Sequence, residues 1–302
     1  MSVTLVTGGL GYLGQHVVRL LADRGHPVVS FNRDRSEHPR PGVEAVQGEL
    51  YDLPRVIETI RSHGVTRIVH TAAMSHPDLS LDFPIATITA NIDGTAHLLE
   101  AARLTDVKRI VNLSSETVYG HHEGPIDEST PLHPTTPYGV TKAATEMLSQ
   151  VYNDRYGFDV ISLRLTEIYG PGNRMPEILR DILKAVLAGR PVELEQGADH
   201  RFNFVHVLDA AEAVVLAAEG GSHQLSAYNI SGPESLLLDE AVSLIRTLVP
   251  EAAIRVGPGH ASLDRQGPWD ISAAKRDLGY EPRWTLARGL ADYVNWLREH
   301  ED

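Results

Sequence analysis

The chain has 302 residues, 42% of them hydrophobic and 22% charged, which is typical of a soluble globular protein. Its 40 acidic residues outnumber 27 basic ones and no basic block is present, so we expect neither nucleic acid nor an anionic membrane as a partner. Without cysteine there are no disulfides or cysteine nucleophiles, and without a signal peptide or an apolar run of roughly 20 residues we expect a cytoplasmic protein.

Short β-branched runs alternate with helical patterns through the first half of the chain. The runs cover residues 3–7, 26–32, 43–48, 66–72, 107–115 and 158–165. The helical patterns between them cover residues 11–25, 52–64, 85–106 and 138–156. Apolar strands that alternate with helices form a parallel sheet covered on both faces, and right-handed crossovers then predict a doubly wound Rossmann fold of the α/β class.

The rhythm changes after about residue 170. Helical patterns at 176–189, 207–221, 236–249 and 286–299 are separated by short strands and by segments rich in Pro and Gly. We therefore predict a dinucleotide-binding Rossmann domain at 1–170 and a smaller, mostly helical, substrate-binding part at 171–302. The boundary is approximate and allows the chain to cross back.

The segment "VTGGLGYLGQHV" places Gly8, Gly11 and Gly14 directly after the first strand and at the start of the first helix. Glycines at these points let the backbone approach a pyrophosphate, which the free N–H groups of the helix N-terminus then bind. A tight turn without a ligand is the alternative, but the strand–turn–helix context favours a dinucleotide site. A P-loop is excluded because no Gly-Lys-Ser/Thr follows.

The end of the second strand reads "SFNRDRS" and bears on the choice of dinucleotide. An acidic residue there would hold the ribose 2′-hydroxyl of NAD, whereas arginines accept the 2′-phosphate of NADP. Asn32, Arg33 and Arg35 therefore favour NADP over NAD. Two alternatives stay open: both arginines could be solvated, and Asp34 could serve NAD in a slightly different register.

Tyr138 and Lys142 lie four residues apart at the start of a predicted helix, so their side chains share one helical face. Alone, this pair is as well explained by a packed tyrosine and a solvated lysine. Ser114 and Ser115, however, end the fifth strand, at the carboxyl edge where open α/β sheets bind ligands. A serine, a tyrosine and a lysine can therefore converge beside the dinucleotide.

These motifs occur together with "GELYD", "HTAA", "NIDGTAHLLEAAR", "NLSSETVYG", "LRLTEIYGPG", "RFNFVHVLDAAEA" and "DLGYEPRWTLARGL". In this order they resemble the extended short-chain dehydrogenase/reductase family, also called the NAD-dependent epimerase/dehydratase family, over nearly the whole chain. The resemblance implies that Tyr138 is the general acid/base, that Lys142 lowers its pKa and binds the nicotinamide ribose, and that Ser115 polarises the substrate oxygen.

The resemblance also extends the cofactor site. It places the pair Glu49 and Leu50 beside adenine, although aspartate is more usual at the first position, and it places Asn91 at a structural or cofactor-side position. The predicted cofactor-binding set, with the residues at the strand ends, is Gly8, Gly11, Tyr12, Leu13, Gly14, Asn32, Arg33, Arg35, Glu49, Leu50, Thr71, Ala72, Ala73, Asn91 and Ile168.

The residues expected to contact substrate do not all favour the same reaction. Glu116 follows Ser115 as in dehydratases of the family, but Thr117 replaces the second acid, so dehydration is the weaker hypothesis. Glu167 stands where nucleotide-sugar enzymes usually have an asparagine that contacts the diphosphate. The further residues expected to contact substrate, through a diphosphate or otherwise, are His76, Arg174, Arg201 and Arg265.

The leading hypothesis is an NAD(P)-dependent nucleotide-sugar epimerase, and the runner-up is an NADPH-dependent reductase or dehydrogenase of a non-nucleotide sugar, lactone or secondary-metabolite ketone. A non-enzymatic dinucleotide sensor is the third, disfavoured because the Ser, Tyr and Lys are all present. We expect no metal site. The resemblance implies a homodimer that pairs the helices around 94–104 and 138–156.

Overall fold

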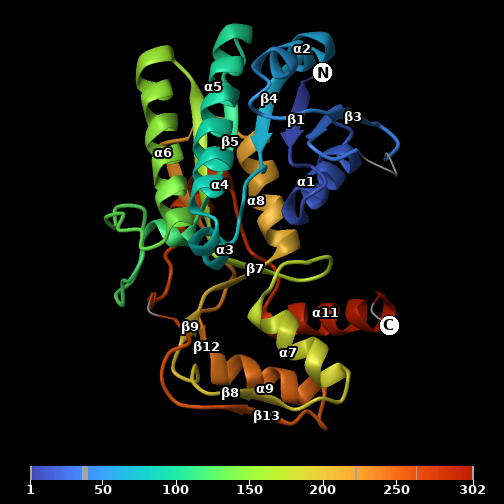
Figure 1. Cartoon of the computed structure of the whole chain (residues 1–302), viewed down its shortest axis with the longest axis vertical. Helices are drawn as coiled ribbons and strands as arrows, with labels where there is room; N and C mark the ends of the chain where they lie inside the picture. Colours follow the sequence, from blue (N-terminus) through green and yellow to red (C-terminus); the bar gives the residue numbers. More distant parts are fainter. Residues whose placement is uncertain (1, 36–39, 222, 263, 301–302) are drawn as a thin grey trace.

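The structure, a computed structural model, describes residues 2–35, 40–221, 223–262 and 264–300. Its centre is a parallel sheet of seven strands (Figure 1). In spatial order they are β11 (Ala227–Ile230), β6 (Asp159–Leu165), β5 (Arg109–Ser115), β4 (Val65–His70), β1 (Val3–Thr7), β2 (Val28–Asn32) and β3 (Val43–Gln47). This arrangement confirms the predicted doubly wound Rossmann fold.

Helices cover both faces of the sheet. On one face, α1 (Tyr12–Asp23) packs against α8 (Val207–Glu219), and the other face is covered by α2 (Leu53–His63), α5 (Gly94–Thr105) and α6 (Pro137–Tyr156). Successive strand residues belong to opposite apolar clusters, because side chains alternate along a strand. Strands buried on both faces explain why the sequence shows continuous apolar runs.

A second group of elements lies below the carboxyl edge of the sheet in Figure 1. It holds three two-stranded sheets, in which β7 pairs with β10, β9 with β12, and β8 with β13. Its elements are β7 (Glu167–Tyr169), α7 (Ile178–Leu187), β8 (Val192–Leu194), β9 (Arg201–Phe202), β10 (Phe204–His206), β12 (Leu236–Leu237), α9 (Leu238–Leu248), β13 (Ile254–Val256) and α11 (Leu286–His300).

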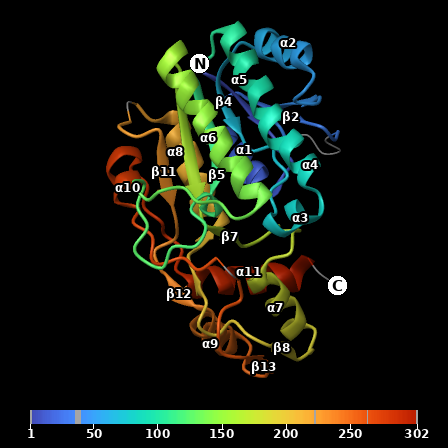
Figure 2. The ribbon, with the colours of Figure 1, turned by 60° about the vertical axis from the view of Figure 1, so that its left-hand side comes forward.

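The chain returns to the large sheet after residue 170. The helix α8 covers the sheet, β11 adds the seventh strand beside β6, and α10 (Ser272–Leu278) packs against β11 (Figure 2). Elements on both sides of residue 170 therefore build the Rossmann unit.

Two connections between strands and helices contribute residues to the candidate site. Three short elements lead from β4 to α5: α3 (Pro77–Asp82), α4 (Pro84–Ile88) and a single π-helical turn, η1 (Thr89–Asp93). A 3-10 turn, η2 (Glu116–Val118), directly follows β5. Among the described residues, no helix is long and apolar enough to cross a membrane.

Candidate active site

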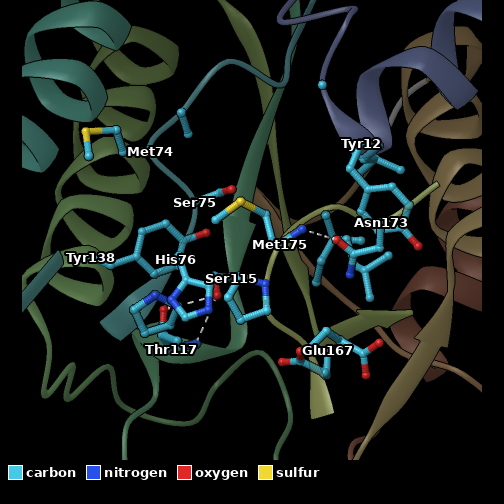
Figure 3. A pocket seen from close by; sticks show the side chains of 18 of the residues that line it. Tyr12, Met74, Ser75, His76, Ser115, Thr117, Tyr138, Glu167, Asn173 and Met175 are labelled. Atoms are coloured by element: carbon cyan, nitrogen blue, oxygen red, sulfur yellow. Dashed lines mark hydrogen bonds between the residues drawn. The ribbon is translucent and has the colours of Figure 1, made fainter. Parts of the chain in front are cut away.

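One large cavity runs along the carboxyl edge of the sheet and down into the second group of elements. It encloses about 1200 Å³ and is lined by the glycine loop, by the ends of β2, β4 and β5, and by β9. Figure 3 shows Ser115, Tyr138 and His76 on one side of it and Tyr12 and Asn173 on the other. The carboxyl edge is where the sequence predicted the site.

The glycine loop has the shape that a dinucleotide requires. Gly8 has a φ of +71°, and a Cβ there would lie 2.8 Å from the backbone of Ala72. A Cβ on Gly14 would lie 2.2 Å from the Gly8 carbonyl oxygen. Only glycine lets the loop stay this close to the start of α1, whose free N–H groups and positive dipole end suit a pyrophosphate. The residues present therefore fit a bound dinucleotide.

The three residues at the end of β2 that were expected to select between NAD and NADP lie in different surroundings. Asn32 is buried and accepts a hydrogen bond of 2.9 Å from the Leu10 N–H, so its side chain braces the glycine loop. Arg33 lines the cavity with its side chain 73% exposed, 3.5 Å from Asp34, which lines it too. Arg35 is exposed and is not among the described residues that line the cavity.

Tyr138 and Lys142 are positioned by the start of α6. The Thr136 hydroxyl caps the helix by accepting a hydrogen bond from the Gly139 N–H, and Pro137 occupies the first helical position. Both side chains are buried and line the cavity. The Lys142 ammonium donates to the Leu113 carbonyl at 2.7 Å and lies 5.6 Å from the centre of the Tyr138 ring.

Burial dominates the titration of both groups. It raises the pKa of Tyr138 far above its usual range; the neighbouring Ser115 hydroxyl opposes this by stabilising the phenolate, and charges on Glu116 and Glu167 add to the rise. Burial lowers the pKa of Lys142 to about 8, against the attraction of Glu146. In this protein environment alone, Tyr138 stays protonated at neutral pH.

The side chain of Ser115, at the end of β5, is held by Thr117, two residues further along the chain. Its Oγ accepts hydrogen bonds from the Thr117 N–H at 3.3 Å and from the Thr117 hydroxyl at 3.0 Å (Figure 3). The first of these bonds caps the η2 turn. Ser115, Thr117, Tyr138 and Lys142 all line the same stretch of the cavity.

A buried ion pair joins β6 to α6, the helix that carries Tyr138 and Lys142, and the sequence analysis missed it. Arg164 on β6 binds Glu146 on α6 with a shortest distance of 2.7 Å, and both side chains are 8% exposed. The Ser114 hydroxyl donates to the same carboxylate, and Arg164 also donates to the Tyr119 hydroxyl at 2.7 Å. The only sequence signal was that Glu146 follows Lys142 by one helical turn.

Carboxyl groups gather opposite Tyr138. Burial, together with the charge of Glu167, raises the pKa of Glu116 well above its usual range. Burial raises the pKa of Glu167 to about 7, with help from Asp78, and that of Glu177 to about 8, with help from Glu167. All four line the cavity. Glu177 and Asp78 were not predicted, because their proximity arises only from the packing of α3 and α7 against the strand ends.

The remaining expected residues divide into two groups. Those that line the cavity are Gly11, Tyr12, Leu13, Glu49, Leu50, Thr71, Ala73, Ile168, His76 and Arg201. Asn91, Arg174 and Arg265 are not among the described residues that do. Asn91 instead bonds the backbone of Met74 and the Thr141 hydroxyl, and Arg265 forms an ion pair with Glu123 at 2.8 Å. The described residues contain no group of three or more His, Cys, Asp or Glu suited to a metal ion.

The sequence model of the NAD dependent epimerase/dehydratase family matches residues 4–231, and the chain belongs to this family. It is thus an NAD(P)-dependent enzyme with an extended Rossmann fold. It is 29% identical to a dTDP-glucose 4,6-dehydratase from Xanthomonas campestris, over 98% of this chain and 93% of that one. It is 30% identical to a UDP-glucose 4-epimerase from Halalkalibacterium halodurans, over 98% and 96%.

A solved structure extends the comparison to three dimensions. The UDP-glucose 4-epimerase of Thermus thermophilus in complex with NAD superposes with a TM-score of 0.88, covers 99% of both chains and is 26% identical. That relative binds NAD, so the comparison supports NAD(P) binding in general but gives no support to the expected preference for NADP.

Proposed function

We propose that this chain is an NAD(P)-dependent epimerase of a nucleotide-linked sugar, which inverts a hydroxyl-bearing carbon through a keto intermediate. The observation that carries the proposal is the convergence of Ser115, Tyr138 and Lys142 on the cavity that the glycine loop also lines. The first two are hydroxyl groups that can bond one substrate oxygen in this cavity, and the third is a buried cation one helical turn from Tyr138.

Each residue has a distinct task. The residues of the glycine loop, with Ala72 and Ala73, hold the dinucleotide, which supplies a hydride acceptor and donor when bound. Tyr138 takes the proton of the sugar hydroxyl during oxidation and returns it during reduction. Ser115 donates to the same oxygen and stabilises the charge that develops there. Lys142, whose pKa of about 8 keeps it mainly cationic at neutral pH, favours the phenolate that Tyr138 must become.

The length of the cavity supports a substrate larger than a monosaccharide. Beyond Tyr138 the cavity continues to Arg201 and Phe202 on β9. Arg201 donates one hydrogen bond to the Ser235 carbonyl at 2.8 Å and has further N–H groups for an anion. The ring of Phe202 offers an apolar face for a base. Relatives that act on UDP- and dTDP-linked sugars support the same substrate class.

One feature favours the second candidate, a reductase or dehydrogenase of a sugar-like ketone without a nucleotide. Glu116, Glu167 and Asp78 would repel a diphosphate if they were all ionised. The pKa of about 7 for Glu167 weakens this objection, because a protonated Glu167 can donate a hydrogen bond as an amide would. The epimerase therefore remains the first proposal.

We further propose that the enzyme binds NADP more tightly than NAD. Asn32 stands in place of a carboxylate at the end of β2 and is already bonded to Leu10. Arg33 lines the cavity with an exposed side chain, and its 3.5 Å contact with Asp34 leaves further N–H groups for a 2′-phosphate. Fluorescence titration with NADPH and NADH tests this. Loss of the preference in Arg33→Ala supports it, whereas tighter binding of NADH by the unaltered protein contradicts it.

We also propose a cytoplasmic homodimer, with residues 1–170 mainly binding the dinucleotide and residues 171–302 mainly the substrate. The support for the dimer is the exposed apolar side chains on α5 and α6, which include Leu104, Val140, Met147 and Val151, with Met147 63% exposed. Sedimentation of Met147→Glu tests this face. The variant should be monomeric, and an unchanged oligomeric state would place the interface elsewhere.

The decisive experiment for the reaction is to identify any nucleotide released on denaturation and then to assay sugar nucleotides by product analysis. Tightly held oxidised cofactor and interconversion of two sugar epimers, with no net change in NAD(P)H, support the epimerase. Net consumption of NADPH with a ketone supports the second candidate. Tyr138→Phe should abolish turnover and leave cofactor affinity within about twofold of the unaltered protein, because only the hydroxyl is removed.

A further inference from the structure

The contacts of Ser115 decide which way its hydroxyl proton points. A hydroxyl group has one donor and two acceptor positions. Both acceptor positions of the Ser115 oxygen are filled from one residue, by the Thr117 N–H at 3.3 Å and the Thr117 hydroxyl at 3.0 Å. The Ser115 proton must therefore be donated to a third group, and Tyr138, which lines the same cavity, is the neighbour whose phenolate this hydroxyl stabilises.

Taking the proposed function as its basis, we propose that Thr117 is a positioning residue: its hydroxyl fixes Ser115 as a hydrogen-bond donor, toward Tyr138 in the absence of substrate and toward the reacting oxygen when substrate is bound. Thr117 lines the same cavity, and its side chain lies on the far side of Ser115 from Tyr138 in Figure 3. The sequence predicted that Thr117 contacts substrate, and the structure adds a hydrogen bond from its hydroxyl to Ser115.

The Thr117 hydroxyl does more than shape the turn. The backbone bond from the Thr117 N–H to Ser115 already caps η2, and any residue except proline can make it at position 117. The hydroxyl bond is a separate interaction between two side chains at the sheet edge. Hydrogen bonds in a chain polarise one another, so a donor into Ser115 strengthens the bond that Ser115 donates.

The consequence is a shift in the proton affinity of Tyr138. A phenolate that receives a stronger hydrogen bond is stabilised, so the pKa of Tyr138 falls. The other groups that face Tyr138 are Lys142 on its own helix, Glu116 on η2, Glu167 on β7 and His76 before α3. None of these contacts involves the Thr117 hydroxyl in the described hydrogen bonds, so its removal isolates the effect on Ser115.

The test compares Thr117→Val, which removes the hydroxyl but keeps the shape and the backbone cap, with Thr117→Ser, which keeps the hydroxyl. Ionisation of Tyr138 is followed by ultraviolet difference spectroscopy against the Tyr138→Phe form of each protein, with oxidised cofactor bound. In Thr117→Val the midpoint should rise by about half a pH unit, and kcat should fall about tenfold, as expected for one lost hydrogen bond. In Thr117→Ser the midpoint should stay in place.

The outcomes are separable. An unchanged midpoint in Thr117→Val, or an equal shift in Thr117→Ser, overturns the positioning role. Thr117→Ala, which cannot clash in the cavity, is measured in parallel and must shift the midpoint in the same direction, so poor folding of the valine variant does not block the test. The spectroscopic midpoint needs no substrate, so the predicted shift together with inactivity on every nucleotide sugar would contradict the proposed function alone.

Discussion

Replacing Glu167 by glutamine probes the energetic cost of the carboxyl groups opposite Tyr138. Burial and the charge of Asp78 raise the pKa of Glu167 from 4.5 to about 7. Between these two values the folded chain holds a proton that the unfolded chain has released, so stability falls as the pH rises through this window. The shift of about 2.5 units corresponds to about 3 kcal/mol at about 1.4 kcal/mol per unit.

Glutamine keeps the size of Glu167 and carries no charge at any pH. Glu167→Gln should therefore match the unaltered protein in stability below pH 4.5 and exceed it by about 3 kcal/mol above pH 7. Urea unfolding at pH 4, 6 and 8 measures the difference. Glu193→Gln, at an exposed position on β8, is the matched control and should change the stability by less than about 0.5 kcal/mol at each pH. A gain for Glu167→Gln that is absent, or independent of pH, would refute the electrostatic reasoning.

Two further predictions concern packing. Gly14→Ala should raise the Kd of the dinucleotide at least about tenfold, because the added Cβ meets the Gly8 carbonyl 2.2 Å away. Gly221→Ala is the control and should leave the Kd unchanged, because nothing lies within 4 Å of the added Cβ. Equal effects of the two substitutions in isothermal titration would contradict the role of the glycine loop in binding the dinucleotide. Glu146→Ala should cost about 3–5 kcal/mol in urea unfolding by stranding a buried Arg164, and adding Arg164→Met should recover much of it. A loss below about 1 kcal/mol would show that the ion pair is not required.

The sequence predicted the sheet because its signals are local. Most strands from β1 to β6 are apolar runs, with the edge strand β3 (VEAVQ) more polar, and the caps of α6, Thr136 and Gly157, stand directly in the sequence. The strands β7 and β10 were not predicted. Each has three residues, and their pairing of Glu167 with Phe204 joins segments far apart in the chain, so it depends on tertiary contacts rather than on propensity.

For the candidate site, too, the sequence predicted the residues that lie on single elements and not the contacts between distant segments. The glycine loop, Ser115, Tyr138 and Lys142 occupy fixed places on single elements, so motif spacing found them. Arg265 was expected at the substrate and instead pairs with Glu123, because a long side chain on a loop follows its nearest opposite charge. The carboxyl cluster joins residues from more than three segments, and the pair of Arg164 with Glu146 joins β6 to α6. No periodicity in the sequence reveals either contact.

The late arrival of β11 has a consequence for biosynthesis. When residue 170 leaves the ribosome, β6 has been made but its outer edge has no partner, and the strand that covers it ends only at Ile230. A nascent or truncated chain that stops between these points exposes unpaired N–H and C=O groups on a buried, apolar strand, which is a template for aggregation. During translation of about 60 further residues this edge of β6 stays unpaired, so a chaperone that covers it would protect the nascent chain.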